Sequence, residues 1–128
     1  MIEISLVTPT YNERENLPLL AAEIFEILAS EPDIDLELIV VDDNSPDGTG
    51  AVAEDLKADY PIQVLHRAGK LGLGSAVMDG WALSDRPYLG VIDADLSHDP
   101  AILLELIHSL REVDLVMGSR FGETSKVE

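Results

Sequence analysis

The chain has 128 residues, no cysteine and a formal net charge of −17. This length fits one domain, and a hydrophobic content of 46% is too high for a disordered acidic tail. The charge disfavours nucleic acid or a bare anionic membrane as a partner, because both attract lysine and arginine. We interpret the charge as a solvated acidic surface, on which the few basic residues are informative because they are rare.

The absence of cysteine excludes a disulfide framework and a thiolate metal site, and it is compatible with a reducing compartment. No apolar run approaches the roughly 20 residues of a membrane span. No signal peptide is recognisable, because Glu3 interrupts the first apolar stretch. We therefore expect a cytoplasmic protein that contacts the cytoplasmic membrane face only peripherally or through segments that this chain lacks.

Apolar runs that predict strands alternate with amphipathic stretches that predict helices. In chain order these are the strand Ile2–Thr8, the helix Glu13–Ser30, the strand Leu36–Val41, the helix Gly48–Asp59, the strand Ile62–His66, the helix Leu73–Ser84, the strand Tyr88–Ile92, the helix Pro100–Arg111 and the strand Val113–Met117. This alternation predicts an α/β fold with a mostly parallel sheet and helices on both faces. The domain is expected to span residues 1–121, with a polar tail over residues 122–128.

The segment Thr8–Glu13 leaves the first strand and opens the first helix. Asn12, with Glu15 three residues later, resembles a capping box. This local role is sufficient for Asn12, but Pro9 and Tyr11 could form the wall of a pocket for a nucleotide base. Glu13 could contact the ribose or the base.

Two aspartates, Asp42 and Asp43, end the second strand. Successive strand residues face opposite sides of a sheet, so we expect the two carboxylates to have different roles. One of these roles could be to accept a hydrogen bond from a base N–H. Asp47 or Thr49 can cap the helix that follows.

The glycine-rich segment after the third strand carries two of the rare cations, Arg67 and Lys70. It is not a Walker A loop, because Lys70 precedes the glycine pair, and it is not a dinucleotide fingerprint, because Val77 stands at the third glycine position. A glycine loop that enters a helix N-terminus can still hold an anion through backbone N–H groups, the helix dipole and Arg67 or Lys70. The alternative is a simple flexible turn.

Asp93 and Asp95 follow the fourth apolar run and stand one residue apart. In extended chain they would point the same way, roughly 7 Å apart, and would repel by about 2 kcal/mol at an effective dielectric near 20. A divalent cation relieves this repulsion, and Mg²⁺ commonly uses one or two carboxylates with water and phosphate oxygens. The alternative is that the two acids simply begin a loop.

Two further segments follow. Asp99 and Pro100 are typical of a helix N-cap and first turn, and His98 before them is expected in an exposed loop. Arg120 leaves the last predicted strand at the same sheet edge as the aspartates. It could bind a phosphate through two hydrogen bonds, or it could form an ion pair with one of the many acids.

These stretches in this order resemble the inverting family 2 glycosyltransferases with the GT-A fold. The likeness is strongest to dolichol-phosphate mannose synthases and related polyprenyl-phosphate sugar synthases. It is carried by VTPTYNERENL, VVDDNSPDGT, RAGKLGLGSA, DADLSHDP and GSRF, which together cover nearly the whole chain. Ser97 departs from the pattern, because the synthases commonly have a metal-coordinating glutamine there.

The resemblance implies a nucleotide-sugar donor, GDP-mannose or a UDP-sugar, and a lipid-phosphate acceptor. It implies that a nucleoside pocket is lined by Pro9, Tyr11, Glu13 and Asp43. It further implies that Asp93 and Asp95 hold Mg²⁺ or Mn²⁺ on the diphosphate and that Arg120 faces the acceptor phosphate.

Members of the resembled family are usually longer by roughly a hundred residues. We therefore interpret the chain as the nucleotide-binding portion of a catalytic domain. Two alternatives remain open: an inactive nucleotide-binding or assembly module, and a transferase that acts on a sugar hydroxyl in polysaccharide synthesis. The sequence also leaves open whether the chain forms a homodimer that covers a free sheet edge.

Overall fold

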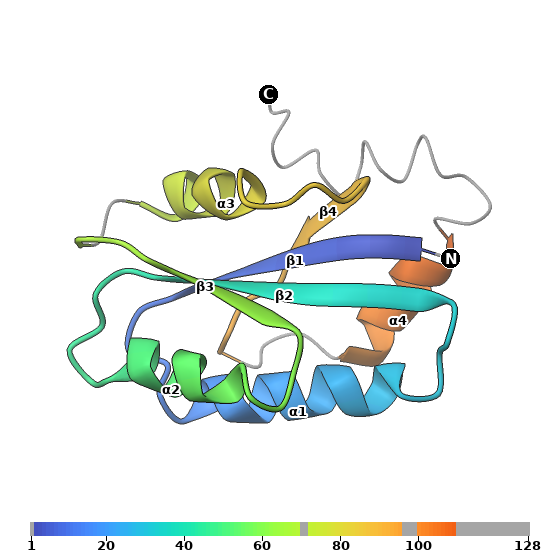
Figure 1. The fold of residues 1–128 in the computed structure, drawn as a ribbon, viewed down its shortest axis with the longest axis horizontal. Helices are drawn as coiled ribbons and strands as arrows, with labels where there is room; N and C mark the ends of the chain where they lie inside the picture. Colours follow the sequence, from blue (N-terminus) through green and yellow to red (C-terminus); the bar gives the residue numbers. More distant parts are fainter. Residues whose placement is uncertain (1, 70–71, 96–99, 110–128) are drawn as a thin grey trace.

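The structure is a computed structural model, and it describes residues 2–69, 72–95 and 100–109. The predicted strand Val113–Met117 and the polar tail lie outside these residues, as do Lys70, Asp99 and Arg120. Within the described part of the chain, four strands and four helices alternate (Figure 1). They are β1 Ile2–Thr10, α1 Asn16–Leu28, β2 Ile34–Asp42, α2 Thr49–Leu56, β3 Ile62–His66, α3 Leu73–Trp81, β4 Tyr88–Val91 and α4 Pro100–Ser109.

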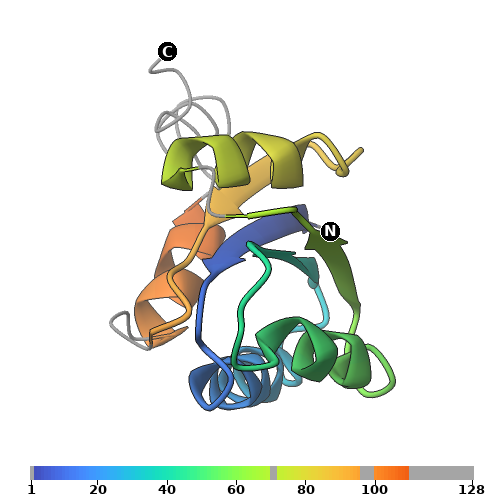
Figure 2. The same ribbon diagram turned by 90° about the vertical axis from the view of Figure 1, so that its left-hand side faces the viewer.

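The four strands form one sheet in the order β3-β2-β1-β4, and all three pairings are parallel. Helices α1, α2 and α4 lie on one face of this sheet, and α3 lies on the other (Figures 1 and 2). The prediction of a parallel sheet with helices on both faces is therefore confirmed. Of the described helices, none combines the length and the apolar character needed to cross a membrane.

The apolar pattern of β1 and β2 explains the two layers. Even-numbered residues such as Ile4 and Leu38 pack in the larger core, against α1, α2 and α4. Odd-numbered residues such as Val7 and Val41 pack in a smaller core against Ala76 of α3 and its neighbours. Both faces of the central strands are thus buried, as a parallel sheet between helices requires.

The α3 face of the sheet becomes polar toward the amino ends of the strands. Ser5 lies two residues before Val7 on the same face, and its hydroxyl donates to Glu37 at 2.6 Å. The Glu37 carboxylate also accepts from Gln63 at 2.9 Å, and Arg86 lies 3.6 Å from it. This cluster holds the chain between α3 and β4 against the sheet, because Ser5 also shares a hydrogen bond of 2.7 Å with Ser84.

The first helix begins later than predicted, and the capping box expected at Asn12 is wrong. Asn12 has a left-handed backbone with φ +60°, and α1 begins after Glu15 with no side-chain cap. The backbone N–H groups of Asn12, Glu13 and Arg14 instead donate to the side chains of Ser45, Thr49 and Asp47, which lie in the loop after β2 and at the first residue of α2. Because these tertiary bonds satisfy the donors, the segment remains a loop.

Candidate functional site

The carboxyl ends of β1, β2 and β3 meet at one edge of the sheet. Thr10 is level with Asp42, and Asp42 is level with His66. The ladder continues one step further, because Asp43 N–H donates to Thr10 O at 3.2 Å and Arg67 N–H donates to Asp42 O at 2.8 Å. The residues that follow the three strands therefore emerge side by side, where α/β proteins commonly place ligands.

Asp42 has a structural role at this edge. Its buried carboxylate accepts hydrogen bonds from the hydroxyls of Thr10 at 2.8 Å and Ser45 at 2.6 Å. It also accepts from the backbone N–H of Ser45 at 3.0 Å. These bonds fix the loop after β2 against the end of β1. Asp43 faces a different set of partners, as the strand alternation predicted.

Arg67 binds Asp43 through a two-pronged ion pair. Nε donates to Oδ1 at 2.6 Å and Nη2 donates to Oδ2 at 2.9 Å, and only 4% of the arginine side chain is exposed. The hydrogen bonds with Asp43 are the main cause that raises the pKa of Arg67, so the guanidinium is charged at every relevant pH.

The remaining donors of Arg67 are directed to α3 and the turn before it. Nη1 donates to Ser75 Oγ at 2.8 Å and to Asp79 Oδ2 at 3.0 Å, and Nη2 donates to Gly72 O at 3.2 Å. These bonds and the fork to Asp43 use all five N–H donors of the guanidinium. The suggestion that Arg67 holds an anion is therefore wrong, and the other cation of the glycine loop, Lys70, lies outside the described residues.

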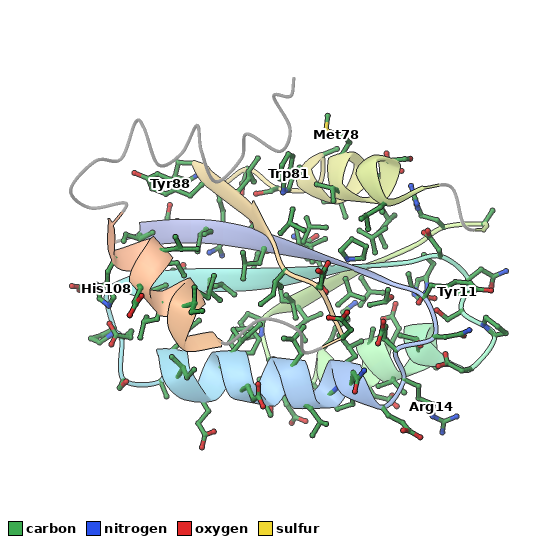
Figure 3. The ribbon with its side chains drawn as sticks, turned by 180° about the vertical axis from the view of Figure 1, so that it is seen from behind. Tyr11, Arg14, Met78, Trp81, Tyr88 and His108 are labelled. Carbon is green, nitrogen blue, oxygen red and sulfur yellow. The ribbon has the colours of Figure 1, made fainter. Side chains whose placement is uncertain are left out.

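A small open cleft lies beside this ion pair, with a volume of about 130 Å³. It is lined by Pro9, Thr10, Tyr11, Asp43, Gly72, Leu73 and Ala76. Tyr11 is 39% exposed at its mouth and lies at the carboxyl end of the sheet (Figure 3). The structure thus brings three of the predicted site residues together, Pro9, Tyr11 and Asp43.

The sequence gives no sign that α3 would supply one wall of this cleft. Gly72 has a φ of +106°, a conformation that glycine adopts readily. It starts α3 so that Leu73 and Ala76 border the cleft. The only available signal was the glycine loop itself, which predicts an approach of backbone to ligand but not which side chains follow.

Glu13 does not line the same cleft. It borders a second, wider depression of about 530 Å³ between the loops after β1 and β2, together with Asn12, Arg14, Glu15, Asn16, Pro46 and Asp47. Its carboxylate accepts from Asn16 Nδ2 at 3.1 Å. The two openings share the loop of residues 11 and 12, so Glu13 is adjacent to the cleft without being part of its wall.

Asp93 and Asp95 follow β4, on the other side of β1. Ile92 N–H donates to Val7 O at 3.0 Å, so the ladder to β1 continues past the last strand residue. The last paired residues of this ladder are Val7 and Val91, so Asp93 follows β4 two residues beyond the pairing, at the same carboxyl edge of the sheet as Pro9. Ala94 between the two acids is buried in the larger core, whereas Asp93 is half-buried and Asp95 is exposed.

The carboxylates of Asp93 and Asp95 suit a hard divalent cation that also binds the phosphate oxygens of a small molecule. Two carboxylates are what Mg²⁺ commonly takes from a protein when phosphates complete its shell. Within residues 2–69, 72–95 and 100–109, no three or more His, Cys, Asp or Glu side chains gather as a metal site. Among these residues, a cation held here would therefore have at most two such side chains as ligands.

Comparisons with known proteins show the family of the chain and its fold. The sequence model of the family "Glycosyl transferase family 2" matches residues 5–127. A dolichol-phosphate mannosyltransferase from Pyrococcus furiosus is 39% identical over 99% of this chain and 36% of its own length. A polyprenol monophosphomannose synthase from Mycolicibacterium smegmatis is 42% identical over 91% of this chain and 44% of its own length.

Among solved structures, a mannosyltransferase from Pyrobaculum calidifontis in complex with GDP-Man and Mn²⁺ superimposes with a TM-score of 0.70. The match covers 84% of this chain and 32% of that one at 22% identity, and it shows a shared fold, the GT-A fold. The chain thus spans less than half the length of these curated relatives. By the match over nearly all of its residues, it belongs to glycosyl transferase family 2.

Proposed function

We propose that this chain is the nucleotide-sugar-binding part of a metal-dependent, inverting glycosyltransferase. The donor is GDP-mannose or a UDP-sugar, and the acceptor is a polyprenyl or dolichyl phosphate. The observation that carries the proposal is the cleft at the ends of β1 and β2, which Asp43 lines together with Pro9 and Tyr11. The relatives named above, which are mannosyltransferases of polyprenyl phosphates by name, support the same choice.

The cleft suits a nucleoside. Pro9 and Tyr11 offer apolar surface on one side, and Leu73 and Ala76 offer it on the other. Arg67 already uses both oxygens of Asp43, but each carboxylate oxygen has a second lone pair. Asp43 can therefore accept a hydrogen bond from a base N–H while it remains paired. Glu13, which lines the adjacent depression, contacts the ribose from outside the wall in this proposal.

The diphosphate then extends toward Asp93 and Asp95, which hold Mg²⁺ or Mn²⁺. When bound, the cation offsets the negative charge that develops on the departing nucleotide diphosphate. Lys70, in the glycine loop, supports the same charge. Arg120 receives the acceptor phosphate, for which a guanidinium is well shaped. We assign its role to Arg120 from the family resemblance, and to Lys70 from its place in a glycine loop that leads into a helix N-terminus.

The acceptor requires little activation. A phosphate monoester has a second pKa near 6, so it is already a nucleophile at neutral pH. The reaction therefore needs no general base comparable to the one that a sugar hydroxyl would need. This favours a lipid phosphate over a polysaccharide as the acceptor. We place the reaction in the cytoplasm, at the membrane face where such a lipid is accessible.

Calorimetry tests the donor site. The chain is titrated with GDP, UDP, GDP-mannose and UDP-glucose, each with Mn²⁺, with Mg²⁺ and without metal. We expect binding that is tighter with a divalent cation, and a preference for one base. The comparison of the two cations also decides between Mg²⁺ and Mn²⁺. No binding of either nucleotide at millimolar concentration would overturn the proposal.

A transfer assay tests the reaction. The protein is incubated with the preferred donor and a polyprenyl phosphate, and the glycosylated lipid is measured. Binding without transfer would favour the inactive nucleotide-binding module over the transferase. Transfer to a sugar hydroxyl, with none to the lipid phosphate, would favour the polysaccharide enzyme.

A further inference from the structure

One buried side chain joins the two walls of the cleft. Arg67 reaches Asp43 at the end of β2 with Nε and Nη2, and it reaches α3 with Nη1. Its guanidinium is therefore a bridge between the wall that presents the carboxylate and the helix that forms the opposite wall. The position of this bridge determines how the carboxylate of Asp43 is oriented toward the cleft.

The α3 end of the bridge depends on two residues. Ser75 and Asp79 are four positions apart, so they lie on the same face of α3. Both accept from Nη1, at 2.8 and 3.0 Å. Of these two partners only Asp79 is a carboxylate, and its own side chain is 51% exposed. The ion pair is thus buried on the arginine side and accessible on the aspartate side.

The C-terminal part of α3 is fixed to the sheet by its own contacts. Gly80, directly after Asp79, is packed against Val7 and Val41 of the sheet. Trp81 Nε1 donates to Gly90 O at 3.1 Å. The second half of α3 is therefore anchored to the sheet, and its first half borders the cleft. Arg67 connects β2 to both halves, through Ser75 in the first and Asp79 in the second.

We propose that Asp79 is a positioning residue for nucleoside recognition, which holds Nη1 of Arg67 and thereby fixes the carboxylate of Asp43 at the base. The inference rests on the proposed function of the cleft. Without Asp79, Nη1 keeps only the neutral hydroxyl of Ser75, and Nη2 keeps Gly72 O, so α3 holds the guanidinium less firmly. The carboxylate of Asp43 is then fixed less firmly at the base, whereas residues 93 and 95 follow β4, on the other side of β1.

The test compares nucleotide affinity in the wild type and in Asp79→Ala, by calorimetry with GDP and with UDP, each with and without Mn²⁺. For the nucleotide that the wild type binds more tightly, we expect Asp79→Ala to weaken binding about three- to fivefold, the range of a half-exposed ion pair. The factor should be the same with and without Mn²⁺, because the change lies at the nucleoside end.

Two further variants separate positioning from a general effect on the helix. Asp79→Asn keeps an oxygen that accepts from Nη1, and we expect affinity within about twofold of the wild type. Ser75→Ala removes the other partner of Nη1 and should weaken binding independently of Asp79→Ala. Asp55→Ala, an exposed acid on α2 at the opposite face of the sheet, is the matched control and should bind as the wild type does.

The outcomes are distinguishable. If the wild type binds neither nucleotide, the proposed function fails and this role of Asp79 fails with it. If the wild type binds and a folded Asp79→Ala binds equally well, only the role of Asp79 is overturned. A loss confined to the Mn²⁺ titrations would also overturn it, because that result would place the effect at the diphosphate. Thermal unfolding reports whether each variant is folded. If Asp79→Ala does not fold, nucleotide binding by Ser75→Ala tests whether the α3 contacts of Nη1 affect the affinity.

Discussion

Gly80 of α3 lies so close to Val7 of β1 that no side chain fits between them. A Cβ atom at residue 80 would be 2.7 Å from one methyl group of Val7 and 2.9 Å from the other, and 3.0 Å from a methyl group of Val41. These neighbouring valines are short, branched and fully buried, so no other rotamer would make room for a Cβ atom. The close approach brings α3 onto the sheet and places its first turn at the cleft.

Gly80→Ala should therefore destabilise the protein, although alanine is the better helix former. The forced shift of packed side chains costs about 1–3 kcal/mol, which outweighs a gain in helix propensity of up to about 1 kcal/mol. Denaturant unfolding measures the difference. Gly74→Ala is the matched control on the same helix, because nothing lies within 4 Å of its Cβ position. A similar loss in both variants would contradict the packing argument.

The two partly or fully buried arginines should differ in their contribution to stability. Arg67→Gln leaves the buried carboxylate of Asp43 without its partner, and such losses cost about 3 kcal/mol or more. Arg86→Gln removes a side chain that is 21% exposed, and its two acidic partners keep other contacts with water or protein: Asp35 is 46% exposed, and Glu37, 3.6 Å away, still accepts from Ser5 and Gln63. We therefore expect a smaller loss, of about 1 kcal/mol. Unfolding by urea compares the two, and equal losses would refute the assignment of Arg67 as the main structural ion pair.

Asp95→Ala should abolish most metal-dependent donor binding and leave the fold intact. Asp95 is exposed, so its removal opens no cavity. Loss of a direct carboxylate ligand should weaken metal-dependent binding at least as much as loss of an outer partner, about 10- to 100-fold. Calorimetry with the preferred nucleotide sugar and Mn²⁺ measures this, with the exposed Asp85→Ala before β4 as control. Unchanged binding in Asp95→Ala would mean that the metal site is wrongly assigned.

Asp47 should contribute stability that disappears in acid. The hydrogen bond from the Thr49 hydroxyl, with smaller contributions from the N–H groups of Thr49 and Arg14, lowers the pKa of Asp47 below its ordinary value of 3.8. Because the pKa is lower in the folded state, the stabilisation is complete well above pH 3.8 and is lost as the pH falls through the folded value. Asp47→Asn should therefore melt below the wild type at pH 7, and the two melting temperatures should converge in acid. A gap that widens below pH 3.8 would contradict this.

Much of the fold could be predicted because its signals are local. The apolar run Ile62–His66 is bounded by Pro61 and Arg67, and the structure has β3 with the same bounds. The start of α1 could not be predicted from its own residues. There the donors of Asn12 to Arg14 are bonded by side chains more than thirty positions away, and such tertiary contacts override a local capping pattern.

The candidate site shows the same limit. Sequence alternation separated the roles of Asp42 and Asp43, and the rarity of basic residues drew attention to Arg67. The fork between Asp43 and Arg67 depends on β2 and β3 being neighbours with Asp42 level with His66. Strand order and register are properties of the whole sheet, and a local pattern does not reveal them. The glycine loop with its two cations therefore resembles an anion site, although Arg67 is bound to the carboxylates of Asp43 and Asp79. The nucleoside, metal and acceptor roles are predictions that measurements of nucleotide binding and sugar transfer test.

The polar cluster around Glu37 also disfavours incorrect registers of β2 along β1 when the sheet forms. A displacement of β2 by one position along β1 would exchange its two faces. Asp35 and Glu37 would then enter the apolar layer beneath α1, and Leu36 and Leu38 would face Ser5 and Arg86. Two ionised groups stripped of water cost several kcal/mol each, so a misaligned sheet is penalised long before the cleft forms. The two acidic residues near the amino end of β2 thus favour the correct register, on which the spacing of residues 9, 43 and 93 depends.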